Sequence, residues 1–188
     1  NVESIGSSAF EDCSGLTEIT IPEGVTSIGS SAFSGCSGLT EINFNAAAIA
    51  DCNSSVFNGA GSNSDGITVV FGENVTSIPA QLFSDENITS VTIGAGVTSI
   101  GYGAFHGCSN LTEINYNAAV VADLTSSSNV FYNVGSNSDG ITVTFGESVT
   151  SIPAYLFENA SANITSVTIG GNVESIGSSA FEDCSGLT

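Results

Sequence analysis

The sequence contains no lysine and no arginine, and its only histidine is His106. Against 19 Asp and Glu residues, this composition gives a formal net charge of −19 at pH 7. Proteins use basic side chains to bind the phosphates of nucleic acids and the headgroups of anionic lipids. We therefore expect neither a nucleic acid nor an anionic membrane surface as a partner. The absence of Lys and Arg also removes the usual salt bridges from within the chain.

Other residue types are scarce or missing as well. The chain has no Met, no Trp and three prolines, and only 10% of its residues are charged. No apolar run approaches the roughly 20 residues that cross a bilayer as a helix, so we expect no membrane insertion. Apolar residues make up 41% of the chain, which is enough for a continuous core, so the acidic balance does not predict disorder.

What the chain does contain is one pattern, copied many times. The first copy begins Val2-Glu-Ser-Ile-Gly-Ser-Ser-Ala-Phe10 and continues to Ile21, and later copies keep its apolar positions. The mean spacing of about 24 residues lies inside the range of leucine-rich repeats. The repeats begin near Val2, Val25, Ala46, Val75, Val97, Ala118, Val149 and Val173. We expect one continuous solenoid over residues 1–188.

Each repeat predicts one coil of a mainly β solenoid. The alternation in Leu16-x-x-Ile19-x-Ile21 is typical of a strand with one buried face, and such strands should stack as a parallel sheet on one side. A second, shorter ladder is expected around Ile28 and its copies, and a single helical turn at Ala9-Phe10. Two inward ladders follow: Ile19, Ile42, Val69, Val91, Ile114, Val143 and Val167, beside Ile21, Phe44, Phe71, Ile93, Tyr116, Phe145 and Ile169.

The run Ser-Ile-Gly-x-x-Ala-Phe-x-x-Cys-Ser-x-Leu-Thr-x-Ile resembles the BspA-like class of leucine-rich repeats. The resemblance covers essentially the whole chain, although Val56-Phe57 and Val130-Phe131 replace Ala-Phe in the two repeats with insertions. It implies a protein of the kind found on bacterial and some protist cell surfaces, where the family is associated with adhesion to host proteins or other cells.

The two terminal segments are identical. Residues 1–17 repeat as residues 172–188, and the pattern stops within a repeat at Leu187-Thr188. Solenoids normally end in atypical polar caps that cover the last apolar layer. We therefore expect this chain to be a window on a longer array of repeats.

The candidate chemical groups favour structural roles. Four of the five cysteines, Cys13, Cys36, Cys108 and Cys184, stand three residues after a Phe, and Cys52 aligns with Leu124. We expect buried thiols without disulfides, with Cys13 and Cys36 as the one neighbouring pair that could form a bond. His106 follows Phe105 at a position that is Glu or Ser in other copies, so we interpret it as a solvated surface residue. The acidic pairs Glu11-Asp12, Asp85-Glu86 and Glu182-Asp183 are interpreted as solvated turns.

No catalytic constellation, cofactor motif or cysteine spacing typical of a metal site is present, and we expect no enzyme activity and no cofactor. The loops Gly-Ser-Asn-Ser-Asp65-Gly and Gly-Ser-Asn-Ser-Asp139-Gly offer oxygens suited to Ca²⁺, but the same residues suit a tight turn. N-glycosylation sequons, all expected at exposed positions, begin at Asn53, Asn74, Asn87, Asn110, Asn159 and Asn163.

These features favour a non-catalytic extracellular protein of a cell surface that adheres to a protein or glycan on another cell or matrix. The alternative is a structural subunit that assembles end to end with copies of itself into an extracellular filament or sheath. The expected recognition surface is the outer face of the main sheet, where repetition would supply avidity. It carries Glu18, Thr20, Glu41, Asn43, Thr92, Glu113, Asn115, Thr144 and Thr168.

Trypsin should leave this chain intact even after unfolding, because trypsin cleaves after Lys and Arg and the chain has neither. The measurement is digestion of the denatured and the folded chain followed by mass spectrometry. Chymotrypsin is the control, because the 11 Phe and 4 Tyr residues give it many sites once the chain unfolds. Fragments produced by pure trypsin would contradict the prediction.

Overall fold

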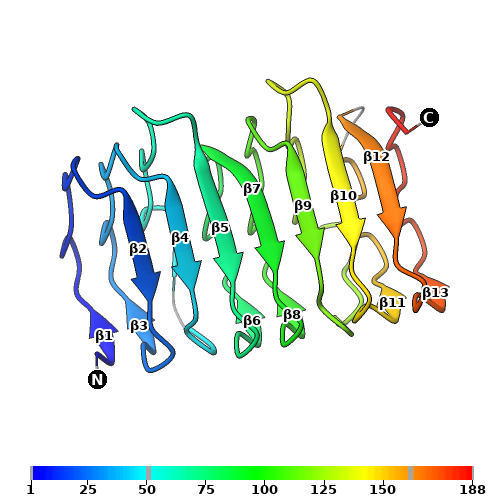
Figure 1. The fold of residues 1–188 in the computed structure, drawn as a ribbon, viewed down its shortest axis with the longest axis horizontal. Coiled ribbons are helices and arrows are strands. Elements are labelled where there is room, and N and C mark those ends of the chain that lie inside the picture. The colour runs from blue at the N-terminus through cyan, green and yellow to red at the C-terminus, as the bar shows by residue number, and fades with distance from the viewer. Residues whose placement is uncertain (1, 50–51, 161–162, 188) are drawn as a thin grey trace.

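The computed structural model describes residues 2–49, 52–160 and 163–187, and it shows a solenoid built from seven parallel strands in one sheet (Figure 1). Asn1 and Thr188, at the outer ends of the two identical segments, lie outside the described residues. Neighbouring strands follow the order of the chain, as expected of stacked coils. The strands are β2 (Glu18–Ile21), β4 (Glu41–Phe44), β5 (Ile67–Phe71), β7 (Ile88–Ile93), β9 (Glu113–Tyr116), β10 (Ile141–Phe145) and β12 (Ile164–Ile169).

The register of the sheet confirms the two inward ladders. Ile19 pairs with Ile42, Ile42 with Val69, and the same row continues through every strand to Val167. Side chains alternate between the two faces of a strand, so this register places all the apolar positions of the repeat on one side. Most of them are fully buried, whereas Ile169 is 45% exposed because β12 is the last strand of the sheet among the described residues.

The second ladder is also present, in three separate pieces. Short strands pair in parallel as β1 with β3, β6 with β8 and β11 with β13. The coils that begin at Ala46 and Ala118 carry no such strand within the described residues, because Ser-Ile is missing from their sequences. The strands are β1 (Ser4–Ile5), β3 (Ser27–Ile28), β6 (Ser77–Ile78), β8 (Ser99–Ile100), β11 (Ser151–Ile152) and β13 (Ser175–Ile176).

The expected single helical turn at Ala9-Phe10 is wrong. Ser8 and Asp12 both have a positive φ, of 57° and 58°, which a right-handed helix excludes. The amides of this segment alternate between two kinds of partner. Ala9 N–H donates to Gly6 O at 3.3 Å within the turn, whereas Phe10 N–H donates to Ala32 O of the next coil at 2.8 Å. The segment therefore joins coil to coil as the strands do. The described residues contain no helix long and apolar enough to cross a membrane.

Glycine at the end of the Ser-Ile-Gly motif lets the coils approach closely. At Gly101 a Cβ would meet the backbone nitrogen of Ala80 in the preceding coil, and at Gly177 it would meet that of Ala154. Atoms at such a separation would clash, so any side chain would push the coils apart. The glycine of the motif is thus required by stacking.

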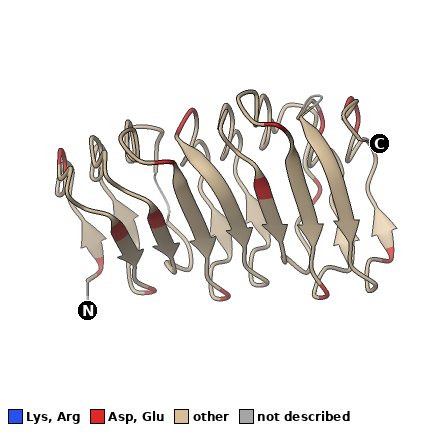
Figure 2. Ribbon diagram, turned by 45° about the horizontal axis from the view of Figure 1, so that its top comes forward, with Lys and Arg blue, Asp and Glu red and all other residues tan. Residues whose placement is uncertain are grey.

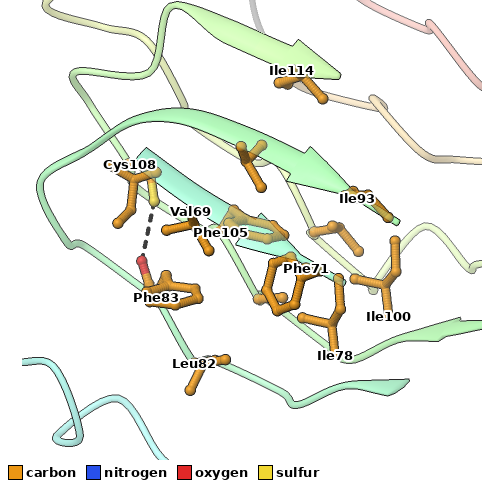
Figure 3. Close-up of a cluster of buried hydrophobic side chains, with 14 of the residues drawn as sticks. Val69, Phe71, Ile78, Leu82, Phe83, Ile93, Ile100, Phe105, Cys108 and Ile114 are labelled. Atoms are coloured by element: carbon orange, nitrogen blue, oxygen red, sulfur yellow. Dashed lines mark hydrogen bonds between the residues drawn. The ribbon is translucent and has the colours of Figure 1, made fainter. Parts of the chain in front are cut away.

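A column of stacked phenylalanines runs through the core. Each coil contributes the Phe of its Ala-Phe, Leu-Phe or Val-Phe pair, and successive ring centroids lie 5.0 to 6.0 Å apart. Figure 3 shows Phe83 and Phe105 of this column among residues of both ladders. Stacking at this distance adds to the free energy gained by burial alone. The column comprises Phe10, Phe33, Phe57, Phe83, Phe105, Phe131, Phe157 and Phe181.

Replacing Phe83 by Ala should lower the free energy of unfolding by about 3–5 kcal/mol, because Phe83 is fully buried between Phe57 and Phe105. Phe10→Ala is the matched control. Phe10 is 36% exposed in the first coil, so its loss should cost clearly less. Urea denaturation followed by circular dichroism measures both. Equal losses for the two variants would show that the burial of a phenylalanine in the column does not set its contribution to the free energy of unfolding.

Candidate functional site

The outer face of the seven-stranded sheet carries two rows of side chains, and all nine residues predicted for the recognition surface lie on it. The register places Glu18, Glu41 and Glu113 in one row and Thr20, Asn43, Thr92, Asn115, Thr144 and Thr168 in the other. Residues not named by the prediction complete the rows: Thr68, Ser90, Thr142 and Ser166 in the first, Val70 in the second. Counting every second residue back from the inward positions would have found them. Their role toward a ligand stays a prediction.

Hydrogen bonds within and between strands organise the polar groups of this face. Asn43 Nδ2 donates to Glu41 Oε1 at 2.8 Å and to Glu18 Oε1 at 3.4 Å. Ser90 Oγ donates to Glu113 Oε2 at 3.0 Å. Amide and hydroxyl groups thus donate the hydrogen bonds to these carboxylates that Lys and Arg would otherwise supply. Figure 2 shows acidic residues in red in the turns at both ends of the strands, with red segments also on β2, β4 and β9.

A hollow opens at the carboxyl ends of β5 and β7, where the outer face meets the following turns. Its volume is about 460 Å³, and Val70 and Thr92 form its border with the sheet. Gly72, Gly94 and Ala95 line its floor with small residues, and Asn117 from a later turn contributes an amide. A site that combines an apolar wall with a few polar groups suits a small polar ligand or a protruding side chain.

The cysteine row lies inside the solenoid. Cys108 Sγ donates to Phe83 O at 3.1 Å (Figure 3). Cys36 Sγ donates to Phe10 O at 3.1 Å, so each thiol bonds to the preceding coil. Burial raises the pKa of both thiols. Cys13, Cys36, Cys108 and Cys184 are all free thiols, as expected. Cys13 is exposed, however, because it lies in the first coil of the described residues, and the expectation that it is buried is wrong.

The two Asp-containing loops use their polar groups to hold the turn. Asn63 Nδ2 donates to Ser37 Oγ at 3.0 Å and Asn137 Nδ2 donates to Ser109 Oγ at 3.2 Å, while Asp65 and Asp139 are exposed. Among residues 2–49, 52–160 and 163–187, no three His, Cys, Asp or Glu side chains gather as a metal-binding group. Calcium binding at Asp65 or Asp139 remains a prediction.

The sequons differ in exposure, contrary to the expectation that all six are exposed. Asn53 and Asn74 are exposed, but Asn87, Asn110, Asn159 and Asn163 are half-buried. The Asn87 amide donates to Gly61 O at 2.8 Å and the Asn163 amide donates to Val134 O at 2.8 Å. Asparagine at the bend before a strand therefore satisfies a carbonyl of the preceding coil. Ser161, the hydroxyl residue of the Asn159 sequon, lies outside the described residues.

Comparison with known families identifies the repeat. Residues 1–112 and 60–188 match the family described as BspA type leucine rich repeat region, in six copies. The chain belongs to the BspA-type leucine-rich repeat family. No sequence among curated proteins matches the chain.

Several solved structures are similar to this chain. A leucine-rich repeat protein from T. pallidum is 22% identical and superposes with a TM-score of 0.53, over 100% of this chain and 72% of that one. One from Bacteroides ovatus is 20% identical, with a TM-score of 0.47, over 100% of this chain and 70% of that one. A leucine-rich cell surface protein from Faecalibacterium prausnitzii is 26% identical, with a TM-score of 0.37, over 100% of this chain and 57% of that one. The T. pallidum structure supports the parallel solenoid and nothing beyond the fold.

Glu86 departs from the pattern of this BspA-type solenoid. It stands three residues after Phe83, at the position that cysteine occupies in four other coils. Its exposure is only 7%, so the interpretation of Asp85-Glu86 as a solvated acidic pair is wrong for Glu86. Burial raises the pKa of the Glu86 carboxyl to about 8, against a hydrogen bond from the Gly59 backbone N–H that lowers it. A comparison of the Phe+3 position between repeats could have found this residue from the sequence.

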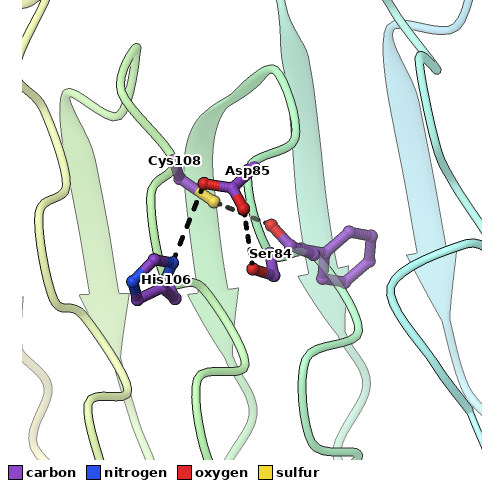
Figure 4. Close-up of polar contacts among 5 residues, drawn as sticks. Ser84, Asp85, His106 and Cys108 are labelled. Atoms are coloured by element: carbon purple, nitrogen blue, oxygen red, sulfur yellow. Dashed lines mark hydrogen bonds and ion pairs between the residues drawn. The ribbon is translucent and has the colours of Figure 1, made fainter.

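Asp85, which precedes Glu86 in the chain, forms a small polar cluster with His106 and Ser84 (Figure 4). His106 Nδ1 lies 3.7 Å from Asp85 Oδ1, and the imidazole stacks on Tyr132 with ring centroids 5.4 Å apart. Ser84 Oγ donates to Asp85 Oδ2 at 3.2 Å. The His106 side chain is 35% exposed, so it lies at the surface as expected but rests against Tyr132 and Asp85. The neighbouring aromatic ring and carboxylate come from adjacent coils, which the local sequence does not reveal.

Glu86→Gln should remove part of the pH dependence of stability. In the folded chain the carboxyl keeps its proton up to about pH 8, whereas in the unfolded chain it releases the proton near pH 4.5. The contribution of Glu86 to the free energy of unfolding is therefore fully present below pH 4.5 and is lost as pH rises to 8, by on the order of 4–5 kcal/mol. The amide that replaces the Glu86 carboxyl is uncharged at every pH, so the variant does not lose this part of its stability as pH rises.

The measurement is urea denaturation of both proteins at pH 5 and pH 9. The difference in unfolding free energy between wild type and Glu86→Gln reports this carboxyl alone. The other acidic residues are the same in both proteins, so their contributions to the pH dependence cancel in the difference. Glu182→Gln, at an exposed position of the last coil, is the control and should leave the pH dependence unchanged. A Glu86→Gln curve parallel to that of the wild type would refute the buried, proton-retaining carboxyl.

Proposed function

We propose that this chain is part of a non-catalytic, extracellular cell-surface protein that binds a protein or glycan of another cell or matrix through the outer face of its sheet. The observation that carries the proposal is the pair of mainly polar rows along this face, one of which borders the hollow at Val70 and Thr92. Membership in the BspA-type family supports the surface location. Repeat solenoids of this kind typically serve as interaction scaffolds rather than as enzymes.

The chemistry of the face favours a ligand held by hydrogen bonds. Thr92, Asn115 and Thr144 offer hydroxyl and amide groups that both donate and accept, as sugars and extended peptides require. The carboxylates of Glu18, Glu41 and Glu113 disfavour anionic ligands. A single contact of this type is weak, and repetition along the solenoid converts weak contacts into avidity.

The alternative is assembly of the chain with copies of itself into a filament or sheath. It is favoured by apolar side chains exposed on the first and last coils of the described residues, including Phe10 at 36% and Ile176 at 52%. When the last coil of one copy binds the first coil of the next, the contacts do not close into a ring and a filament results. Sedimentation velocity over a concentration series separates the two functions, because a binding module stays monomeric where a filament subunit elongates.

Thr92→Arg should weaken ligand binding about tenfold or more, because a long side chain fills the hollow at its border with the sheet. Thr144→Arg is the matched control. Thr144 lies in the same row, on β10, away from the residues that line the hollow, so its replacement should have a smaller effect. The measurement is biolayer interferometry of the wild type and both variants against arrays of extracellular matrix proteins and glycans. Equal loss in both variants, or binding by neither the wild type nor the variants, would contradict the proposed site.

A further inference from the structure

A second hollow lies on the turn side of the solenoid, away from the sheet face, between the coil that begins at Ala46 and the coil that begins at Val75. Its volume is about 500 Å³. Asn58, Gly59 and Ser62 line it from the first coil, and Gln81, Asp85 and Glu86 line it from the second. Gly59 stands two residues after Phe57, the position that Gly35 and Gly107 hold in two other coils. Gly59 has open space where a Cβ would stand, so the backbone N–H that bonds Glu86 also borders the hollow.

Glu86 is the residue of this hollow that stacking does not explain. Every other coil has a small or apolar residue at the same position, three after the Phe. Those residues are Cys13, Cys36, Ala60, Cys108, Val134, Ala160 and Cys184. A buried carboxylate without a positive partner is strongly disfavoured relative to such residues. Residues 1–188 include no Lys or Arg that could pair with it, so this part of the chain leaves the carboxylate without a Lys or Arg partner.

The groups around Glu86 favour a cation. Asp85 from its own turn lines the same hollow, and His106 contacts Asp85. Cys108 faces Glu86 from the next coil, and burial raises the pKa of its thiol, so that it stays neutral. Although His106 and Cys108 lie nearby, no three of the His, Cys, Asp and Glu side chains in the described residues are arranged to hold a metal ion. The lining named above holds no aromatic ring of the kind that stacks on a sugar. An organic cation that donates several hydrogen bonds fits these acceptors better than a metal ion does.

We propose that this hollow receives one guanidinium or ammonium group from an Arg or Lys side chain of a protein partner, with Glu86 as its principal acceptor and Asp85 as a second. The proposal does not rest on the role of the sheet face. An ion pair with Glu86 forms as the carboxyl loses its proton. A guanidinium stays charged at every accessible pH, so it is the sharper probe.

The binding should tighten as pH rises from 7 to 9. With a pKa of about 8, roughly a tenth of Glu86 is ionised at pH 7 and roughly nine tenths at pH 9. Apparent affinity scales with the fraction of the binding-competent form, so binding of a guanidinium should be about tenfold tighter at pH 9. The bound cation in turn should lower the pKa of Glu86.

The experiment is an NMR titration of the ¹⁵N,¹³C-labelled chain at constant ionic strength, with acetyl-Gly-Gly-Arg-Gly-Gly-amide as the probe. The same peptide with citrulline in place of Arg is the neutral control, and methylguanidinium tests a free small cation. We expect the Arg peptide to shift the Gly59 amide and the Glu86 carboxyl carbon, and to bind more tightly than methylguanidinium, because its stem and backbone also fill the hollow. Glu86→Gln should weaken binding about tenfold at pH 9 and abolish its dependence on pH.

Glu182→Gln removes the same charge from an exposed turn and should leave binding unchanged. Equal affinity for the Arg and citrulline peptides, or equal affinity of wild type and Glu86→Gln, would overturn the proposal. Methylguanidinium that binds as tightly as the peptide would overturn the assignment to a protein side chain. Glu86→Gln replaces a carboxyl that is mainly protonated at pH 7 by a neutral group of the same shape, and circular dichroism checks that it folds.

Discussion

Contact between successive coils is the interaction on which the rest of this structure depends. A single coil of about 24 residues has too little interior to bury its own apolar side chains, and its strands have no partner within the coil. Stacking satisfies both needs at once. Backbone amides of the sheet and of the turn around Phe10 donate to the neighbouring coil, and the phenylalanine column fills the space between them. The same close approach explains why glycine follows the isoleucine of β3, β8 and β13, where a Cβ would meet the backbone of the preceding coil.

The demands of stacking leave the outer surface free to vary. Inward positions keep Ile, Val and Phe because each must fit the residues above and below it. The alternate positions of the same strands face outward, where Thr, Asn, Glu and even Val70 occur in register. Without lysine or arginine, the carboxylates of this face are held by amide and hydroxyl donors such as Asn43 and Ser90. The result is a regular, polar surface whose pattern differs from coil to coil.

Glu86 illustrates how a repeat protein can place a functional group without a new fold. A position that elsewhere holds a cysteine bonded to the preceding coil here holds a carboxyl at the wall of a hollow. Its neighbours Ala60 and Cys108 keep the ordinary packing, so the departure stays local to one turn. Such a substitution destabilises the chain as pH rises, and it persists most readily where a partner supplies the missing positive charge.

The sequence by itself determined the solenoid, the parallel sheet and both inward ladders, because a period of two within each strand and a period of about 24 between strands leave one arrangement that buries all apolar positions. Only the tertiary structure decided the turn around Phe10, because its left-handed residues are favoured by amides that reach the next coil rather than by local propensity. It also decided the burial of Glu86, the contact of His106 with Asp85 and Tyr132, and the bonds of Asn87 and Asn163. Each of these depends on residues more than 20 positions away in the chain, at a separation set by the path of a whole coil.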